Sequence, residues 1–183
     1  MRDQLAPGFL IATPHLADPN FKQTVVLLFD HDDNGAVGLV INRPVDIQLR
    51  RVVRELGIEA DRVPDVPVYY GGPVQMDVGW LIHGVGYDDV STRPVADDVL
   101  ISTSRDALTA VAGNEGPDEF QLCLGYAGWG QGQLEHEVAE GAWLTLPFDR
   151  SLVFSVPAGE RWREAYRRLG IDPSMFSPVM GSA

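Results

Sequence analysis

The chain has 183 residues, of which 45% are hydrophobic, and it carries 14 basic against 26 acidic residues, a formal net charge of −12. Such composition is typical of a globular protein, and the length predicts a single domain spanning residues 1–183. The negative charge argues against generic binding to nucleic acids or anionic lipids, and the only cysteine, Cys123, excludes an internal disulfide scaffold.

The N-terminal part predicts a β-hairpin preceded by a short strand. Phe9–Ala12 indicates the first strand, and the proline-containing segment Thr13–Asn20 indicates a loop. Thr24–Phe29 and Ala36–Ile41 are rich in β-branched residues and are separated by an Asn-Gly turn, which is a strong hairpin signal. Both runs are apolar on both faces, so we expect them to be central in a sheet.

A helix is expected next. The Asn42-Arg43-Pro44 segment ends the preceding strand, Asp46 is the predicted N-cap and Gly57 the predicted C-cap. One apolar stripe at helical spacing supports this interpretation; it consists of Leu49, Val52, Val53 and Leu56.

The rest of the chain predicts more strands than helices. The expected strands are Val68–Tyr70, Gly79–His83, Asp98–Ser102, Phe120–Tyr126, Trp143–Leu146 and Leu152–Val156. The expected helices run from a cap at Thr103 or Ser104 to about Ala112, over Gln133–Glu140 and over Glu160–Leu169. Because strands and helices do not alternate regularly, a doubly wound fold is disfavoured. We predict an α+β fold with a mixed, bent sheet flanked by about three to four helices.

The first residues and the apolar runs of the chain together predict its cellular location. Residues Met1–Leu5 lack the apolar core of a signal peptide, and the longest apolar runs are far below the ~18–20 residues of a membrane span. We therefore expect a cytoplasmic protein without a membrane segment, present as a monomer or a weak homodimer.

No metal site is predicted. Asp30-x-Asp32-x-Asn34-Gly35 matches the first half of a calcium loop, but the twelfth position is Ile41 where a bidentate Glu is required. A polar hairpin turn explains this segment better. The four histidines have no local metal-ligand spacing; they are His15, His31, His83 and His136.

No catalytic set is complete and no cofactor is predicted. No GxSxG elbow occurs, and Cys123 has no basic neighbour in sequence that would activate it, so a buried structural thiol is favoured. Four glycines lie between Gly125 and Gly132, between a predicted strand and helix, and free N–H groups there could bind an anion. The segment departs from GxxxxGK[ST] and GxGxxG, so a packing turn anchored by Trp129 competes with an anion site, and a pocket combining both stays open.

Half of the basic residues fall on two predicted helices. These arginines are Arg50, Arg51, Arg54, Arg161, Arg163, Arg167 and Arg168. If the two helices lay side by side, they would form a positive stripe for nucleic acid. Glu160 and Glu164 precede arginines by three or four residues, however, and a salt-bridged, solvated face agrees better with the net charge.

Four ordered segments together resemble the YqgE/AlgH family. They are Pro7–Pro14 with Asp18 and Phe21, then Gly35–Pro44, then Gly71-Gly72-Pro73-Val74, and finally Gly125–Trp129 followed by Gly132–Glu135. The resemblance extends from about Gly8 to Gly170, and Gln131 is one departure, where Pro or Ala would be expected. It implies a bacterial cytoplasmic protein with a small barrel-like core and a bifurcated sheet surrounded by helices. It further implies a link to transcriptional control of alginate production, without an agreed activity.

The residues and the resemblance indicate the same candidate ligand-binding cleft at strand ends, where sites are commonly built on loops. Its expected members are His15, Asp18, Asn20, Asn42, Arg43, Gly71, Gly72, Trp129, Gln133 and Glu135. The leading hypothesis is a non-enzymatic binding or regulatory module for an unknown protein or small molecule. One alternative is an enzyme whose site is assembled from strand-end loops around Arg43, Trp129 and Glu135, with Arg43 as anion binder and Glu135 or His15 as base. Another is a nucleic-acid-binding regulator that uses the arginine-rich helices, which the net charge disfavours.

Overall fold

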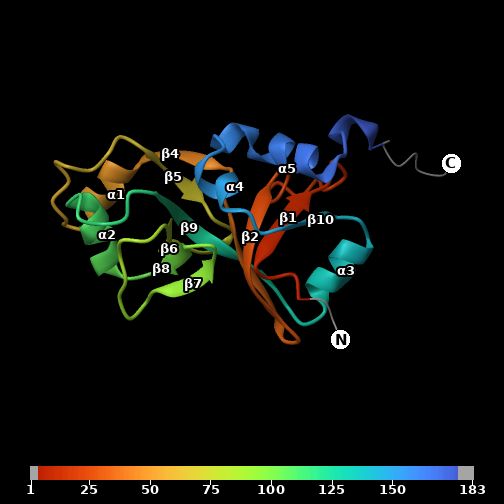
Figure 1. The fold of residues 1–183 in the computed structure, drawn as a ribbon, viewed down its shortest axis with the longest axis horizontal. Coiled ribbons are helices and arrows are strands. Elements are labelled where there is room, and N and C mark those ends of the chain that lie inside the picture. Colours follow the sequence, from red (N-terminus) through yellow and green to blue (C-terminus); the bar gives the residue numbers. More distant parts are fainter. Residues whose placement is uncertain (1–3, 177–183) are drawn as a thin grey trace.

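The computed structural model describes residues 4–176, in which ten strands form one sheet in the order β10-β1-β2-β3-β9-β6-β8-β7, with β4 and β5 beside this path (Figure 1). The strands are β1 (Gly8–Ala12), β2 (Val25–Asp32), β3 (Gly35–Val40), β4 (Pro44–Gln48), β5 (Pro67–Tyr70), β6 (Val74–His83), β7 (Arg93–Ala96), β8 (Val99–Ser102), β9 (Phe120–Trp129) and β10 (Trp143–Pro147). The α-helices are α1 (Leu49–Glu55), α2 (Arg105–Ala112), α3 (Gln133–Ala139), α4 (Arg150–Phe154) and α5 (Arg161–Leu169), and the 3₁₀ turns are η1 (Ala158–Glu160) and η2 (Pro173–Met175). The expected α+β class is confirmed.

The β2–β3 hairpin forms the centre of the sheet, as its apolar sequence predicts. Successive side chains of a strand point to opposite faces. Val25 and Leu27 accordingly belong to one buried cluster, and Val26 and Leu28 belong to another on the opposite face. Both faces are covered, which explains why Val25–Phe29 of β2 and the whole of β3 contain no polar side chains.

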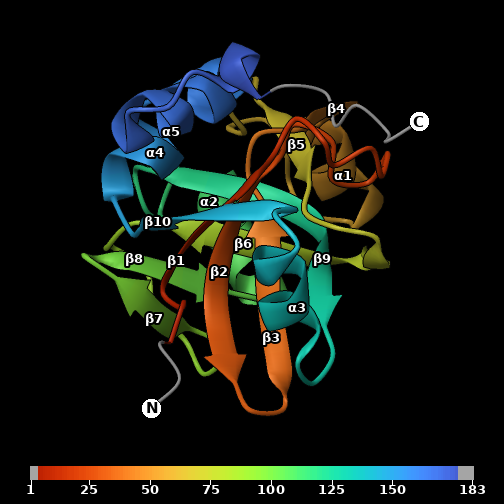
Figure 2. The ribbon, with the colours of Figure 1, turned by 90° about the vertical axis from the view of Figure 1, so that its right-hand side faces the viewer.

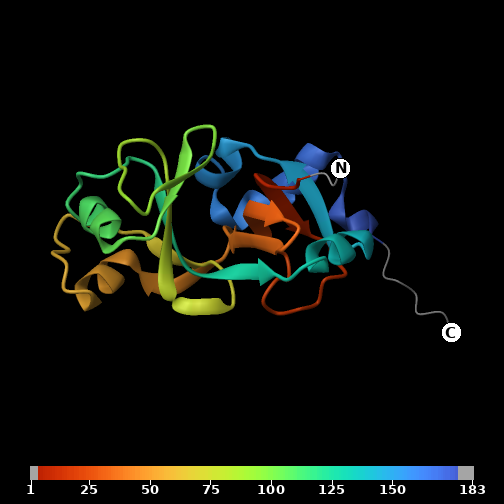
Figure 3. The ribbon, with the colours of Figure 1, turned by 90° about the horizontal axis from the view of Figure 1, so that it is seen from below.

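The helices cover the sheet in separate groups. α4 and α5 supply Leu152, Ala165 and Tyr166 to the cluster on one face, while α3 supplies Leu134 to the other. α1 and α2 enclose a third cluster against β5, β6 and β9. Figures 1 and 3 show α1 and α2 together at one end of the long axis and α3 at the other, and Figure 2 shows α3 in front of the hairpin.

The sheet divides at β9, which gives it the bifurcated form. The first half of β9 pairs with β6 on one edge and, in parallel, with β5 on the other. Its last residues pair with β3, on the same edge as β5 but beyond the point where β5 ends. The sheet also bends, so that Arg93 of β7 lies over the ring of Phe29 in β2, 5.1 Å from its centroid. Among the described strands, no pairing of β7 with β2 closes this curve into a barrel.

Two local predictions are wrong, and the first concerns the segment assigned to a helix capped by Asp46. This segment first forms β4, in which Pro44, Asp46 and Gln48 are exposed while the two residues between them are partly buried. Such alternation suits a strand, and α1 starts only at Leu49 without a side-chain cap. Gly57 does follow the helix end with a positive φ of 73°.

The predicted strand Leu152–Val156 is instead the short helix α4 and the turn after it, which adds a fifth helix to those expected. The Asp149 carboxylate accepts a hydrogen bond from the Ser151 amide and caps the helix. Leu152 and Val153 are both fully buried, which adjacent residues of a strand with one exposed face cannot achieve.

Sequence reasoning also missed β7, whose residues are exposed or only partly buried and therefore show no apolar alternation. Within residues 4–176, no helix is both long and apolar enough to cross a membrane. Residues 1–3, which begin the segment examined for a signal peptide, lie outside the described part of the chain.

Candidate functional site

The glycine motifs meet at the division of the sheet, a region that we call the glycine fork and define by Gly71, Gly72 and Gly125. A Cβ atom on Gly71 would lie 2.3 Å from the Gly125 carbonyl oxygen, and one on Gly72 would lie 2.1 Å from that of Tyr126. Gly125, at φ +76°, would place a Cβ 2.3 Å from the Gly72 oxygen. Two backbones therefore cross here in direct contact, which only glycine permits.

The fork is a packing device, and this changes the interpretation of the glycine-rich segment. The sequence predicted that the strand ends at Tyr126 and a bend follows, yet β9 continues to Trp129. The Gly71 amide donates to Leu124 O, and the Val40 amide donates to Gly71 O, so backbone hydrogen bonds occupy the crossing. The glycines allow β5 and β3 to share one edge of β9, and the Gly71 and Val40 amides are not free for an anion.

A buried cation lies beside the fork. Arg161, at the start of α5, is 5% exposed and donates from Nε to Val156 O, and from Nη1 to Gln121 Oε1 at 2.8 Å and to Ile41 O. All three acceptors are neutral, so its charge has no carboxylate partner in the described part of the chain. Burial lowers the pKa of Arg161, although a guanidinium remains charged in proteins. Burial also raises the pKa of the nearby Cys123 thiol to about 12, which makes it inert.

Arg43 holds the loop before β2. Its Nη1 donates to Pro19 O and Asn20 O at 3.0 and 2.9 Å, and its Nη2 donates to Lys22 O at 2.7 Å. The guanidinium also lies over the Tyr70 ring, 5.5 Å from its centroid. One side chain thus fixes three carbonyl groups of the loop backbone to the segment that follows β3.

The neighbouring residue Asn42 fixes the same loop. Its side-chain oxygen accepts from the Val25 amide at 2.9 Å, and its side-chain nitrogen donates to Gln23 O at 2.9 Å. The loop before β2 is therefore held in place by both residues that follow β3.

Two other predicted cleft residues join this cluster from the loop itself. The Asp18 carboxylate accepts from the Asn20 amide at 2.9 Å, and the Asn20 side chain accepts from the Tyr70 hydroxyl at 3.1 Å. The structure therefore brings together Asp18, Asn20 and the pair of residues that follows β3.

Trp129 and Gln133 belong to an adjoining packed region. Phe21, from the same loop, lies 6.1 Å from the Trp129 ring and 5.6 Å from the Trp143 ring. Both indole N–H groups donate to Glu137 Oε1, at 3.3 and 3.1 Å. Gln133 donates to the other oxygen of Glu137 at 3.1 Å. Trp129 is only 6% exposed, so it anchors α3 to the sheet and offers little surface to a ligand.

The remaining predicted cleft residues lie elsewhere. Glu135 accepts from His31 Nε2 at 2.8 Å, and His31 Nδ1 accepts from the Leu5 amide, which fixes the neutral tautomer. His15 packs edge-on against Phe176, with ring centroids 5.9 Å apart. The two glycine candidates are enclosed in the fork. The ten candidates therefore do not all face one cavity.

The arginines of α1 and α5 do not form one stripe, because these helices lie apart in Figures 1 and 2. On α1, Arg50 donates to Val63 O, and Arg51 pairs with Glu55 at 3.1 Å. Arg54 is exposed.

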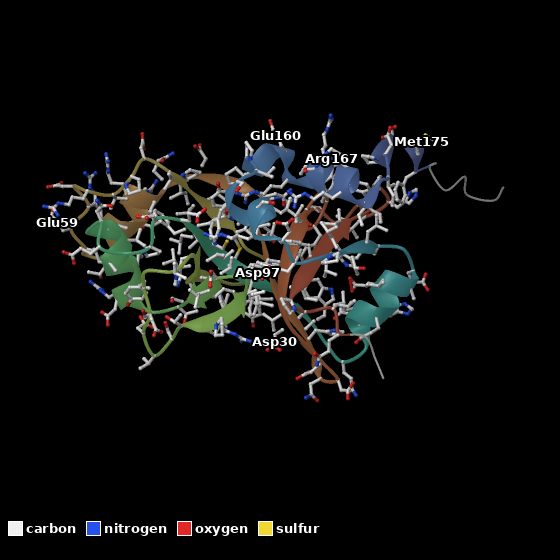
Figure 4. All side chains as sticks on the ribbon, in the orientation of Figure 1. Asp30, Glu59, Asp97, Glu160, Arg167 and Met175 are labelled. Atoms are coloured by element: carbon white, nitrogen blue, oxygen red, sulfur yellow. The ribbon has the colours of Figure 1, made fainter. Side chains whose placement is uncertain are left out.

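On α5, most of the arginines are buried or paired. Arg161 is enclosed in the core, and both Arg167 and Arg168 bond to Glu164. Figure 4 shows Glu160 and Arg167 on the outer surface of the helical layer, as expected for a solvated face of mixed charge. Arg163 differs from these neighbours because it is exposed and has no such partner.

The part of this region that is open to ligands is a polar depression of about 400 Å³. It lies between the loop before β2, which contains Lys22 and which we call the Lys22 loop, the end of β3 and the start of α5. Its lining contains the cations Lys22, Arg43 and Arg163, the amides of Gln23 and Asn42, and also Gly159 and Trp162. Among the described residues, no acidic side chain belongs to this lining. The polar depression contains only two of the predicted cleft residues, Asn42 and Arg43.

Lys22, Gln23 and Trp162 are members that sequence reasoning did not nominate. Lys22 is the only lysine of the chain, and this rarity was a usable signal. It is exposed and forms no ion pair within residues 4–176, and the same holds for Arg163. Arg43 gives its hydrogen bonds to neutral carbonyls and likewise forms no ion pair within residues 4–176.

A second polar cluster, outside the predicted cleft, fixes the loop between β6 and β7. The Asp89 carboxylate accepts hydrogen bonds from the side chains of Ser104 and Ser91, and such bonds hold its pKa well below the usual range. Nearby, Ser102 bonds to the fully buried ring of His83, and burial lowers the pKa of this ring. Because its members satisfy one another, the cluster orders the loop and leaves no vacant donor set.

The described residues, 4–176, contain no group of three or more His, Cys, Asp or Glu side chains that could hold a metal ion. The chemistry available at the polar depression is therefore recognition of negative charge by guanidinium, ammonium and amide groups.

The chain is similar to known proteins over nearly its whole length. A family model described as AlgH-like matches residues 9–174. A UPF0301 protein of Thioalkalivibrio sulfidiphilus is 46% identical over 96% of this chain and 95% of its own, and one from Azoarcus is 45% identical over 98% and 96%. The solution structure of the AlgH protein from Pseudomonas aeruginosa superposes with a TM-score of 0.78, at 42% identity and full coverage of both chains.

A crystal structure from Corynebacterium diphtheriae, at 22% identity and a TM-score of 0.71 over 98% of this chain and 91% of that one, shares the fold alone. The family match over nearly the whole sequence agrees with the resemblance of the four motifs, three of which build the hairpin and the glycine fork. The chain therefore belongs to the AlgH-like, or UPF0301, family.

Proposed function

We propose that this protein is a non-enzymatic binding module whose ligand is a small anion held in the polar depression. The observation that supports this is the meeting of three cations that form no ion pair within residues 4–176, Lys22, Arg43 and Arg163, in a chain whose net charge is −12. In such a protein most cations are expected to pair with carboxylates. A group of unpaired cations in a concave site attracts anions that the rest of the surface repels.

The buried Arg161 adds to the positive potential. Its Nη1 bonds to Ile41 O, and Ile41 directly precedes Asn42 in the lining of the depression. A charge that is removed from solvent is screened less by salt than an exposed one. An anion in the depression would therefore interact with four cations and would supply the negative charge that Arg161 lacks.

The site is also preorganised. Arg43 and Asn42 already hold the Lys22 loop through hydrogen bonds to its backbone, so ligand binding does not have to order that loop. Less conformational entropy is lost on binding when the site is fixed beforehand. Gln23 and Asn42 offer neutral polar groups beside the charges.

The proposal is tested by titrating inorganic phosphate and pyrophosphate into the wild-type protein and following ¹H–¹⁵N NMR shifts. The variant Lys22→Gln/Arg163→Gln removes two charges from the depression. The matched control Arg54→Gln/Arg62→Gln removes two exposed charges elsewhere. We expect binding to weaken by about tenfold or more in the first variant, a loss of about 1.4 kcal/mol, and to change less than about twofold in the control.

Equal weakening in both variants would mean that only net charge matters and would overturn the proposal. So would the absence of shifts in residues 22, 23, 42 and 43 at millimolar pyrophosphate. The enzyme alternative requires Arg43, Trp129 and Glu135 in one pocket, but Trp129 is buried and Glu135 pairs with His31. No observation favours it, and none favours the arginine stripe over binding at the polar depression.

A further inference from the structure

A second hollow borders the polar depression along α5; we call it the Trp162 groove and define it by Pro14, Trp162, Arg163, Asp172, Pro173 and Ser174. The groove has a volume of about 410 Å³ and is mainly apolar. Trp162 and Arg163 belong to the lining of both hollows. In Figure 4, Glu160 and Met175 mark the two ends of this stretch of chain. One ligand could thus contact both hollows across the Trp162 ring.

The Trp162 ring is held rigidly between them. Its indole N–H donates to Ala12 O at 2.9 Å, and its ring packs edge-on against Tyr166 with centroids 4.9 Å apart. The Tyr166 hydroxyl donates to the same carbonyl at 3.0 Å. A fixed aromatic surface costs little entropy when a flat group stacks on it. Trp162 is therefore suited to bind the ring of a ligand.

The two hollows differ in electrostatic character, because the groove is mainly apolar and has a carboxylate at its far end. At the far end of the Trp162 groove, Asp172 accepts hydrogen bonds from Ser174, and these bonds lower the pKa of its carboxyl group. This carboxylate repels a second anionic group at that end. At the near end, Lys22, Arg43 and Arg163 attract one. The charges disfavour a second anionic group at the groove end, and the mainly apolar lining of the groove favours an uncharged ring there.

We infer that the natural ligand is a small organic phosphate whose phosphate group binds in the polar depression and whose flat, uncharged ring stacks on Trp162 in the groove. Nucleoside monophosphates with a neutral base are one class with this chemistry. This inference rests on the proposed anion site and adds the part of the ligand beyond the anion. Stacking on an aromatic side chain contributes measurably to binding of such rings.

The test compares inorganic phosphate, ribose 5-phosphate, phenyl phosphate and adenosine 5′-monophosphate by ¹H–¹⁵N NMR. Trp162→Phe keeps an aromatic face and Trp162→Leu removes it. Both variants lose the indole hydrogen bond, so a difference in binding between them reports the aromatic ring and not the loss of that bond. We expect the two aromatic phosphates to bind at least about fivefold more tightly than phosphate and ribose 5-phosphate. Trp162→Leu should abolish this preference, and Trp162→Phe should largely retain it.

Asp172→Asn provides a second test that does not disturb the ring, because asparagine can replace aspartate as the cap of η2. In the wild type, 4-carboxyphenyl phosphate should bind more weakly than phenyl phosphate, and in this variant the difference should shrink. If phosphate binds but the aromatic ligands bind no better, the inference is wrong and the anion site stands. If none of the four ligands binds, the proposed function fails with it.

Discussion

The glycine fork and the polar depression both adjoin the end of β3, yet they are built by opposite means. At the fork, backbones cross without side chains, and every amide named above has a backbone partner. At the depression, long charged side chains surround an open volume, and its three cations form no ion pair within the described chain. The prominent sequence motif and the candidate site therefore need not coincide: the glycines hold the scaffold, and less conspicuous cations present the chemistry.

The largest effect is expected from Gly72→Ala, which tests whether the fork is purely structural. The new Cβ would lie 2.1 Å from two backbone atoms of Tyr126, where nothing flexible can move away. We expect a loss of more than about 4 kcal/mol, so that the protein fails to fold. Gly141→Ala is the matched control, since Gly141 also has a positive φ, +80°, but no neighbour within 4 Å. It should lose only about 1–2 kcal/mol in urea unfolding. Equal stability of the two variants would refute the account of the fork.

A smaller loss is expected from Arg161→Met, which separates the buried cation from the exposed ones. The change removes the Arg161 donor from Val156 O and Gln121 Oε1, while Ile41 O keeps only the hydrogen bond that Gln121 Nε2 donates to it. We expect destabilisation by about 3–5 kcal/mol in urea unfolding. A loss below about 1 kcal/mol would show that the buried charge is not integral to the core.

The pH dependence of the free energy of unfolding tests whether Cys123, which lies in the interior beside the fork, is shielded from solvent. Cys123 has a pKa of about 12 in the folded protein against an ordinary 9.0, so the unfolded thiol ionises first as the pH rises. The stabilisation that the protonated Cys123 thiol gives to the folded protein is complete below about pH 9. It declines as the pH rises toward 12, by at most about 1.4 kcal/mol per pH unit. Urea unfolding at pH 8 to 10.5 should therefore be less steeply pH-dependent in Cys123→Ala than in the wild type. Identical slopes would mean that the thiol is not shielded as the structure indicates.

The smallest effects on stability are expected at the depression itself. Lys22→Gln and Arg163→Gln alter exposed side chains without ion-pair partners in residues 4–176. Each should change the free energy of unfolding by less than about 0.5 kcal/mol, even where anion binding is lost. Losses above about 1 kcal/mol in thermal or urea unfolding would make these residues structural and would remove the contrast with the fork.

Much of the fold followed from local patterns. The apolar hairpin, the Ser104 cap of α2 and the buried face of α5 were predictable because alternation, capping and helical spacing are read within a few residues. α4 and β4 were mistaken because five-residue elements are too short for a period to decide between helix and strand. There the fold's packing, not the local pattern, selects the conformation.

The candidate site was predictable only in part. Asn42 and Arg43 were found because they end a strand, but Trp162 and Arg163 reach the same depression from a helix about 120 residues later. Nothing in the sequence of α5 distinguishes Arg163, which faces the depression, from Arg161, which is buried. That distinction depends on where the helix docks, which is a tertiary property. The hydrogen-bonding roles of two further acceptors, Glu137 and Gln121, were missed for the same reason.

The shared edge of β9 limits how the length of the chain can change during evolution. β5 pairs with this strand at Cys123 and Leu124, and β3 pairs with it from Ala127 to Trp129, so one strand sets the alignment of both partners. A shift of a single residue turns every later side chain of a strand to the opposite face. An insertion or deletion inside β9 would therefore disturb two pairings at once, whereas the loops between elements can lengthen independently. We therefore expect natural variation in length to fall in the connecting loops, including those that border the depression, and not at the centre of the sheet.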